Sequence, residues 1–349
     1  MGTERHSADG GRVFDAEGLW WSLPPGPLNA ITDVPGVKVG HATIREGRAR
    51  TGVTAILPHA GDLFRRRVVA GAATLNGFGK SAGLMQLEEL GEIETPILLT
   101  NTMAVPACAA ALTRMAIEAN PGIGRGAPSL NALVMECNDG ILNDMQALPV
   151  TEAHVRAAVG AAGVEVAQGT VGAGTGMRTF GMAGGIGTAS RIVRTMGAEF
   201  SLGALVLSNF GAREELRVLG LRIAPPGGAE GGTDKGSIII VMATDAPMGS
   251  RQLTRLARRA SAGLGRLGSF LAHGSGDVAV AFTTANQIDA ASERAVEPIR
   301  RLSESAMDAF FLAAVEAVEE SVLHALWFAE AAPGYDATIL PALRDILGE

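Results

Sequence analysis

Residues 237–243 limit the possible fold more than any other part of the sequence, because they read Ser-Ile-Ile-Ile-Val-Met-Ala. Ile and Val are branched at Cβ, which restricts their side-chain torsions and favours extended strands. A short apolar run of this kind predicts a buried strand, and residues 204–208 and 278–283 predict two more. The chain also has 46 glycines and a single tyrosine, so small side chains and closely packed backbone must fill its core. Together these features predict layered sheets.

Helices are predicted between and after these strands. Apolar residues at helical spacing indicate helices at 81–90, 107–119, 151–162 and 251–271, and within 293–331 with a break near Pro298. Residues 1–28 have no regular pattern and end in Pro-Pro-Gly-Pro, which disfavours helices and strands. No Pro- or Ser-rich linker divides the remainder. We therefore expect a leader at 1–28 and a single domain at 29–349.

Composition and spacing disfavour several functional classes. The net charge is −7 and the arginines do not cluster with aromatic residues, so nucleic acid is not expected as a partner. The six histidines show no metal-ligand spacing, and the glycine-rich segment 169–187 lacks both common phosphate-loop patterns. We expect no metal and no cofactor, and interpret segment 169–187 as tight turns or as a close approach of two sheets.

The sequence also bears on the compartment. No apolar run reaches the roughly 20 residues of a membrane span, and no export signal is visible at the N-terminus. Cys108 and Cys137 lie in small or apolar surroundings and suit a reducing compartment. We expect a cytoplasmic protein that does not bind membranes.

The Gly236–Ser237 junction can be interpreted in two ways. Gly-Ser before a strand is common turn chemistry. Alternatively, Gly236 leaves room for a nucleophile, and cleavage of this bond would give Ser237 both a hydroxyl and an α-amine with a pKa of roughly 8. The six histidines are scattered along the sequence and supply no obvious catalytic set for a histidine-based hydrolase. A serine nucleophile in this chain would therefore need another base, which its own α-amine can supply.

Eight ordered runs together resemble a known family. They lie at residues 31–41, 50–58, 76–80, 95–102, 172–177, 184–188, 236–239 and 243–247, and include ITDVPGVKVGH, NGFGK and GSII. These runs are similar to those of the DmpA-type peptidases, peptidase family S58, which includes D-aminopeptidases and β-aminopeptidases. The resemblance covers nearly the whole chain from about residue 28.

The resemblance implies a four-layer αββα sandwich, of the type shared by DmpA and the ornithine acetyltransferases. It also implies self-cleavage between Gly236 and Ser237, which would give an α chain of residues 1–236 and a β chain of residues 237–349. The chain has a second Gly-Ser pair, Gly249–Ser250, at the start of the predicted helix 251–271. We interpret Ser250 as a helix cap and place the cleavage at Ser237.

The family motifs suggest a catalytic set around Ser237. Ser275 matches a family serine that contacts the nucleophile, and Asp277 matches an acidic position near it, so the two could orient the amine and hydroxyl of Ser237. Asn209 matches the family's oxyanion-hole asparagine. Ordinary turn roles are the alternative for all three residues.

Several residues near position 136 could bind the ammonium group of the substrate. Glu136, at the end of a predicted strand, could do so by a charge-assisted hydrogen bond. Asp139, Asn143 and Asp144 follow in the adjoining turn and are equally able to do so.

The chain departs from the family pattern at two positions. Many relatives have Phe-Lys-Gly-Gly-Ile-Gly-Thr where this chain has Met-Ala-Gly-Gly-Ile-Gly-Thr, so Ala183 stands in the place of a lysine. Loss of that charge could slow the reaction or alter specificity, and Arg178 could substitute for it. Cys137 also differs from the expected residue.

The resemblance therefore implies a self-processing aminopeptidase or amidase that acts on small peptides or amides through an acyl-enzyme on Ser237. D-, L- and β-aminoacyl substrates all remain open. Alternatives are an acyltransferase of the ornithine-acetyltransferase type and a weakly catalytic member that serves in binding or assembly. Relatives assemble as multimers, so we expect a homo-oligomer of cleaved αβ pairs.

Overall fold

A six-stranded sheet carries the buried strand predicted at residues 237–243. The computed structural model describes residues 20–223 and 236–348. The strand order is β4-β3-β14-β13-β10-β9, with β13 and β14 parallel and the other neighbours antiparallel. The strands are β3 (Arg66–Gly77), β4 (Glu92–Ile93), β9 (Gly185–Thr195), β10 (Ala198–Asn209), β13 (Ser237–Thr244) and β14 (Gly276–Asp289). The uncharged run 237–243 thus forms an inner strand, as predicted.

A second sheet of four strands has the order β1-β2-β5-β6. Its strands are β1 (Lys38–Ile44), β2 (Thr51–Leu57), β5 (Ile97–Asn101) and β6 (Val134–Cys137). The helices are α1 (Leu84–Leu90), α2 (Val105–Ala119), α3 (Glu152–Gly160), α4 (Ser250–Ala257), α5 (Ala260–Arg266), α6 (Met307–Trp327) and α7 (Leu343–Leu347). In the described part of the chain, no helix combines the length and apolarity needed to cross a bilayer.

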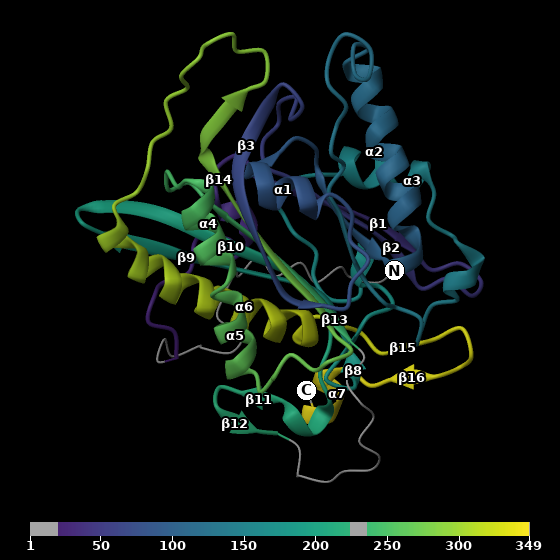
Figure 1. Cartoon of the computed structure of the whole chain (residues 1–349). Coiled ribbons are helices and arrows are strands. Elements are labelled where there is room, and N and C mark those ends of the chain that lie inside the picture. The colour runs from purple at the N-terminus through teal and green to yellow at the C-terminus, as the bar shows by residue number, and fades with distance from the viewer. Residues whose placement is uncertain (1–19, 224–235, 349) are drawn as a thin grey trace.

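The two sheets and their helices form four layers (Figure 1). Helices α4 to α6 cover one face of the six-stranded sheet, and α2 and α3 pack on the four-stranded sheet. Three buried apolar clusters fill the interfaces, one between the two sheets and one beneath each helical layer. The protein is therefore the mixed α/β, αββα sandwich that the resemblance implied.

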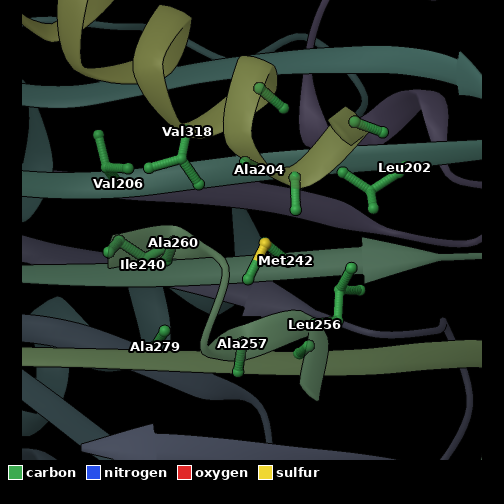
Figure 2. Packing of buried hydrophobic residues seen from close by; sticks show 14 of the residues in the cluster. Leu202, Ala204, Val206, Ile240, Met242, Leu256, Ala257, Ala260, Ala279 and Val318 are labelled. Carbon is green, nitrogen blue, oxygen red and sulfur yellow. The ribbon is translucent and has the colours of Figure 1, made fainter. Parts of the chain in front are cut away.

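Alternation along β13 shows which way its side chains point. Ile238, Ile240 and Met242 pack toward α6, whereas Ile239 and Val241 pack between the sheets. This period of two is the ordinary geometry of a strand. Figure 2 shows the helical side of this packing, with residues of β10 and β13 beneath α6. Every side chain of β13 is buried, which explains why its sequence is almost wholly apolar.

The glycine-rich segment lies where the two sheets approach closely. The short turn Gly172–Gly174 contacts both β2 and β9. A Cβ atom on Gly176 would lie 2.1 Å from the carbonyl oxygen of Arg50, and one on Gly174 would lie 2.6 Å from the amide nitrogen of Ile186. Larger residues would therefore collide with the backbone of either sheet. This finding supports the interpretation as a close approach of two sheets.

The predicted helix 251–271 is wrong as one continuous element. The structure has two helices here, α4 and α5, separated at Arg258 and Arg259. Helix α4 packs on β3 and β14, whereas α5 packs on α6, so the chain changes direction between them. Ser250 is also not the cap that we expected, because Gly249 occupies the N-cap position and Ser250 begins the helix.

The described part of the expected leader packs against the sandwich. Main-chain amides of Ser22 and Leu23 donate to the carboxylate of Glu316 on α6, at 2.8 and 3.2 Å. The buried Arg191 of β9 pairs with the same carboxylate at 3.1 Å, and its guanidinium lies 4.8 Å from the centre of the Trp21 ring. These contacts tie residues 21–23 to β9 and α6.

Shorter elements complete the fold. Three two-stranded ribbons pair β7 (Arg178–Thr179) with β8 (Met182–Ala183), β11 (Arg217–Val218) with β12 (Leu221–Arg222), and β15 (Ala332–Pro333) with β16 (Ile339–Leu340). Short 3-10 turns lie at Ile31–Asp33, Thr102–Ala104, Met145–Ala147, Gly172–Gly174, Arg213–Glu215 and Glu304–Ala306.

Candidate active site

Ser237 is the first residue of β13 and lies between two neighbouring strand ends. Its cross-strand partner on β10 is Asn209, and its partner on β14 is Gly276. Ser237 and Asn209 have the same parity as the residues that pack between the sheets, such as Ile239 and Leu207. The sheet therefore places Ser237 beside Asn209, with only 5% of Ser237 exposed.

The Gly236–Ser237 junction is held by hydrogen bonds. The hydroxyl of Ser237 donates to the carbonyl oxygen of Gly236 at 2.7 Å. The amide of Gly276 donates to the same carbonyl oxygen at 3.2 Å and to the Ser237 Oγ at 3.4 Å. One main-chain donor thus faces both the hydroxyl and the carbonyl of this junction.

Ser275 and Asp277 flank Gly276 and form a buried pair. The Ser275 hydroxyl donates to Oδ1 of Asp277 at 2.6 Å. The structure therefore brings both predicted residues next to the residue that pairs with Ser237. The Ser275 hydroxyl is directed at Asp277 and not at Ser237, so it orients the carboxylate.

The side chain of Asn209 is fixed at both ends. Its Oδ1 accepts from the amide of Arg178 at 2.8 Å, and its Nδ2 donates to the carbonyl oxygen of Asn138 at 2.9 Å. A side-chain amide has two donor protons, and the bond to Asn138 uses one. The fixed amide of Asn209 can therefore direct its second proton toward a negative charge beside Ser237.

Glu136 lies at the end of β6, in the opposite sheet, and is connected to the Ser237 region through Gly79. Its Oε1 accepts from the amide of Lys80 at 2.8 Å, and its Oε2 accepts from the Thr102 hydroxyl. A Cβ atom on Gly79 would lie 3.6 Å from Glu136 Oε1 and 3.9 Å from the Cα of Gly276. Gly79 therefore separates the carboxylate from the strand end next to Ser237.

The other three candidates for ammonium binding make different contacts. Asp139 is fully buried, and its Oδ1 accepts from Asn143 at 2.9 Å. Asn143 in turn accepts from the amide of Arg50, and Asp144 pairs with Arg48 at 2.8 Å. Burial raises the pKa of the Asp139 carboxyl from 3.8 to about 7. Of the four candidates, Glu136 is the one with contacts to segment 78–80.

The structure locates both departures from the family pattern. Ala183 on β8 is the cross-strand partner of Arg178 on β7. Side chains of such partners stand on one face of the ribbon, so Arg178 provides a positive charge on the face of Ala183. Cys137 is fully buried with its thiol directed to the carbonyl oxygen of Leu207. Burial raises the pKa of this thiol well above its usual value, which keeps it neutral.

Three contributions to the site were missed by sequence reasoning. The amides of Gly276 and Lys80 are main-chain groups, which leave no mark on residue identity. The hydroxyl of Thr102 donates to Glu136. The only sign of this role in the sequence is that Thr102 lies in one of the eight family-like runs. Within residues 20–223 and 236–348, no three His, Cys, Asp or Glu side chains group as metal ligands would.

Comparison with known proteins decides the family. The profile of peptidase family S58 matches residues 29–340. The chain belongs to peptidase family S58. It is 38% identical to the β-peptidyl aminopeptidase BapA of Sphingosinicella microcystinivorans, across 97% of this chain and 90% of that protein.

Solved structures of similar proteins have the same fold. The PH0078 protein of Pyrococcus horikoshii OT3 superposes with a TM-score of 0.88 at 45% identity, covering 93% of this chain and 94% of that one. The L-aminopeptidase D-Ala-esterase/amidase of Ochrobactrum anthropi gives 0.85 at 38% identity, covering 93% and 96%. The latter is described as a prototype for the serine aminopeptidases and as a variant of the Ntn hydrolase fold. This family member is accordingly a serine aminopeptidase.

Proposed function

We propose that the chain cleaves itself between Gly236 and Ser237, and that the new N-terminal Ser237 then hydrolyses small peptides or amino-acid amides with a free amine. The observation that carries this proposal is the junction itself, where a buried hydroxyl, the preceding carbonyl and the amide of Gly276 meet within 3.4 Å. The names of the relatives, a β-peptidyl aminopeptidase and an L-aminopeptidase D-Ala-esterase/amidase, support the same activity.

Self-cleavage would begin with attack of Ser237 Oγ on the carbonyl carbon of Gly236. Negative charge would develop on the Gly236 oxygen, which already accepts from the Gly276 amide at 3.2 Å. Breaking the C–N bond would pass the hydroxyl proton to the nitrogen and leave an ester on Oγ. Water would then hydrolyse the ester, giving a carboxylate on Gly236 and a free α-amine on Ser237.

The same atoms would carry out turnover on a substrate. The neutral α-amine of Ser237 would accept the hydroxyl proton as Oγ attacks the scissile carbonyl. The amides of Asn209 and Gly276 would donate to the resulting oxyanion, and the leaving amine would take the proton. Water would release the acyl group from Oγ in a second step. The Ser275 hydroxyl would hold the Asp277 carboxylate in place, so that its negative charge stays beside the α-amine of Ser237.

Glu136 would select substrates with a free amine. Glu136 is 2% exposed, and its carboxylate is held by the Lys80 amide and the Thr102 hydroxyl. Two donors leave acceptor capacity on the carboxylate for an ammonium group. A charge-assisted hydrogen bond in such a buried site is stronger than one between neutral groups.

Hydrolysis of a panel of D-, L- and β-aminoacyl amides tests the proposed turnover. The wild-type chain is expected to release free amine from at least one class, and Ser237→Ala is expected to release none. Ser250→Ala is the matched control, because it alters the second Gly-Ser pair at the start of α4. Equal activity in Ser237→Ala and wild type would refute the nucleophile. An acceptor amine in the assay separates hydrolysis from acyl transfer.

A further inference from the structure

An exposed cluster of Phe78, Lys80 and His273 lies beside the candidate active site. Phe78 and Lys80 follow the end of β3, and 56% of Phe78 is exposed. The Lys80 Nζ lies 4.4 Å from the centre of the Phe78 ring, and the His273 ring centre lies 6.4 Å from it. The three side chains thus present an aromatic face with an ammonium group above it.

Backbone contacts connect this cluster to the nucleophile. A Cβ atom on Gly276 would lie 2.8 Å from the carbonyl oxygen of Phe78, so these residues are packed against each other. The amide of Gly276 lies 3.4 Å from Ser237 Oγ. The main-chain amide of Lys80 donates to Glu136 Oε1 at 2.8 Å. The side-chain Nζ of Lys80 turns back and lies 3.4 Å from the Phe78 carbonyl oxygen. One short segment therefore contacts both the neighbour of Ser237 and the proposed ammonium-binding carboxylate.

The Lys80 ammonium is available for an anionic group. Its contacts within residues 20–223 and 236–348 are the Phe78 carbonyl oxygen and the Phe78 ring, and no carboxylate there forms an ion pair with it. An ammonium group is strongly hydrated and binds carboxylates as a compact positive charge. Its place beside an exposed aromatic ring suits a ligand that combines a carboxylate with an apolar side chain.

A C-terminal amino acid has this combination. In a dipeptide, the residue after the scissile bond carries its carboxylate within one residue length of the attacked carbonyl, about 3.3–3.6 Å of chain. Glu136, which accepts from the Lys80 amide at 2.8 Å, would hold the amine at the other end of the substrate.

Resting on the function proposed above, we infer that Phe78 and Lys80 form a subsite for a leaving amino acid with a free carboxylate and an apolar side chain. Lys80 binds the carboxylate, and Phe78, with His273 beside it, packs against the side chain. Short peptides with a free C-terminus are then better substrates than the corresponding amides.

A pair of substrates that differ only at the C-terminus tests this subsite. An aminoacyl-phenylalanine and its C-terminal amide are compared on wild type, Lys80→Met and Phe78→Ala, with Lys38→Met on β1 as the control. Lys80→Met keeps the main-chain amide that holds Glu136. The preference is measured as kcat/KM for the free acid divided by kcat/KM for the amide. In Lys80→Met this ratio is expected to be about three- to tenfold lower than in wild type, mainly because KM for the acid rises.

Each outcome of this comparison is decisive. Lys38→Met is expected to keep the wild-type ratio, and Phe78→Ala is expected to weaken both substrates. In wild type, the preference should shrink with added salt, because an exposed charge pair is screened. An acid-to-amide ratio that is the same in wild type and Lys80→Met would overturn the subsite.

A binding measurement separates this inference from the proposed function. Saturation-transfer NMR of free phenylalanine and phenylalanine amide reports occupancy without turnover. Stronger transfer to phenylalanine, lost in Lys80→Met and kept in Lys38→Met, would support the subsite even if wild type hydrolysed neither peptide. Equal transfer to both ligands in wild type would refute the subsite even if both peptides were hydrolysed.

Discussion

The amide nitrogen of Gly276 lies 3.2 Å from the carbonyl oxygen of Gly236, the atom that would become negative if Ser237 attacked its own chain. The parallel pairing of β13 with β14 fixes this relationship, since it places Gly276 opposite Ser237. A main-chain donor held by two strands needs no reorganisation as charge develops. The strand pairing that builds the core therefore also places a hydrogen-bond donor at the carbonyl of the proposed cleavage site.

Gly276→Ala is expected to slow self-cleavage at least about tenfold, because its Cβ would lie 2.8 Å from the Phe78 carbonyl oxygen and displace the strand end. The fraction of cleaved chain over time, measured on a denaturing gel, checks this. Gly265→Ala is the control, since a Cβ there meets nothing within 4 Å. Equal cleavage rates in the two variants would rule out a role for this amide.

Asn209→Ala is expected to lower kcat by about 10²–10³ with a smaller change in KM, the usual cost of losing an oxyanion donor. Asn209→Asp keeps an acceptor for the Arg178 amide but removes the donor protons. Steady-state kinetics on an aminoacyl amide should therefore show both variants impaired. Wild-type kcat in Asn209→Asp would mean that Asn209 serves only to hold Arg178.

Glu136→Gln is expected to raise KM about tenfold or more for substrates with a free amine, because a neutral amide replaces the carboxylate. Steady-state kinetics measure this change. Asp144→Asn is the matched control, since Asp144 pairs with Arg48 in a separate contact. An increase in KM that is equal in the two variants would argue against ammonium binding by Glu136.

Stability is expected to fall as pH rises because of Asp139. Burial raises its pKa from 3.8 to about 7 in the folded chain. Between these values the folded protein keeps a proton that the unfolded chain has released, so the free energy of unfolding decreases as pH rises from about 4 to about 7. Asp139→Asn keeps an oxygen that can accept from Asn143 but has no titrating group. Between pH 5 and pH 8, the variant should therefore avoid a loss in the free energy of unfolding on the order of 2–4 kcal/mol that the parent undergoes.

Urea unfolding at pH 5 and pH 8 measures this effect. A Ser237→Ala background keeps every sample as one chain, if self-cleavage proceeds as proposed. Asp144→Asn is again the control, because Asp144 is not deeply buried. Parallel pH profiles for Asp139→Asn and its Asp139 parent would show that the buried carboxyl does not titrate in this range.

The sequence predicted best those parts of the fold whose apolar residues form a pattern along the chain. Residues 237–244 form an inner strand because the uninterrupted apolar run at 238–243 can be satisfied only by burial on both faces. The break between α4 and α5 was not predicted, because the helical spacing of apolar residues continues from one helix into the next although the direction of the helix axis changes. What redirects the chain there is packing of α5 on α6, a contact between distant segments.

The position of the candidate site was predictable where side chains would carry the proposed chemistry. Asn209 lies directly opposite Ser237 on β10. Ser275 and Asp277 flank Gly276, the residue that lies opposite Ser237 on β14. Donors from the main chain could not be predicted, since strand register creates them. The subsite of Phe78 and Lys80 also depends on contacts between residues nearly 200 positions apart, such as the packing of Phe78 on Gly276.

Intact mass of the purified chain tests the central claim most directly. Wild type is expected to give two species, with the masses of residues 1–236 and 237–349, whereas Ser237→Ala gives one full-length species and Ser250→Ala cleaves as wild type does. N-terminal sequencing of the smaller species should begin Ser-Ile-Ile-Ile. A wild-type preparation that stays full-length under all conditions in which it hydrolyses substrate would contradict the account.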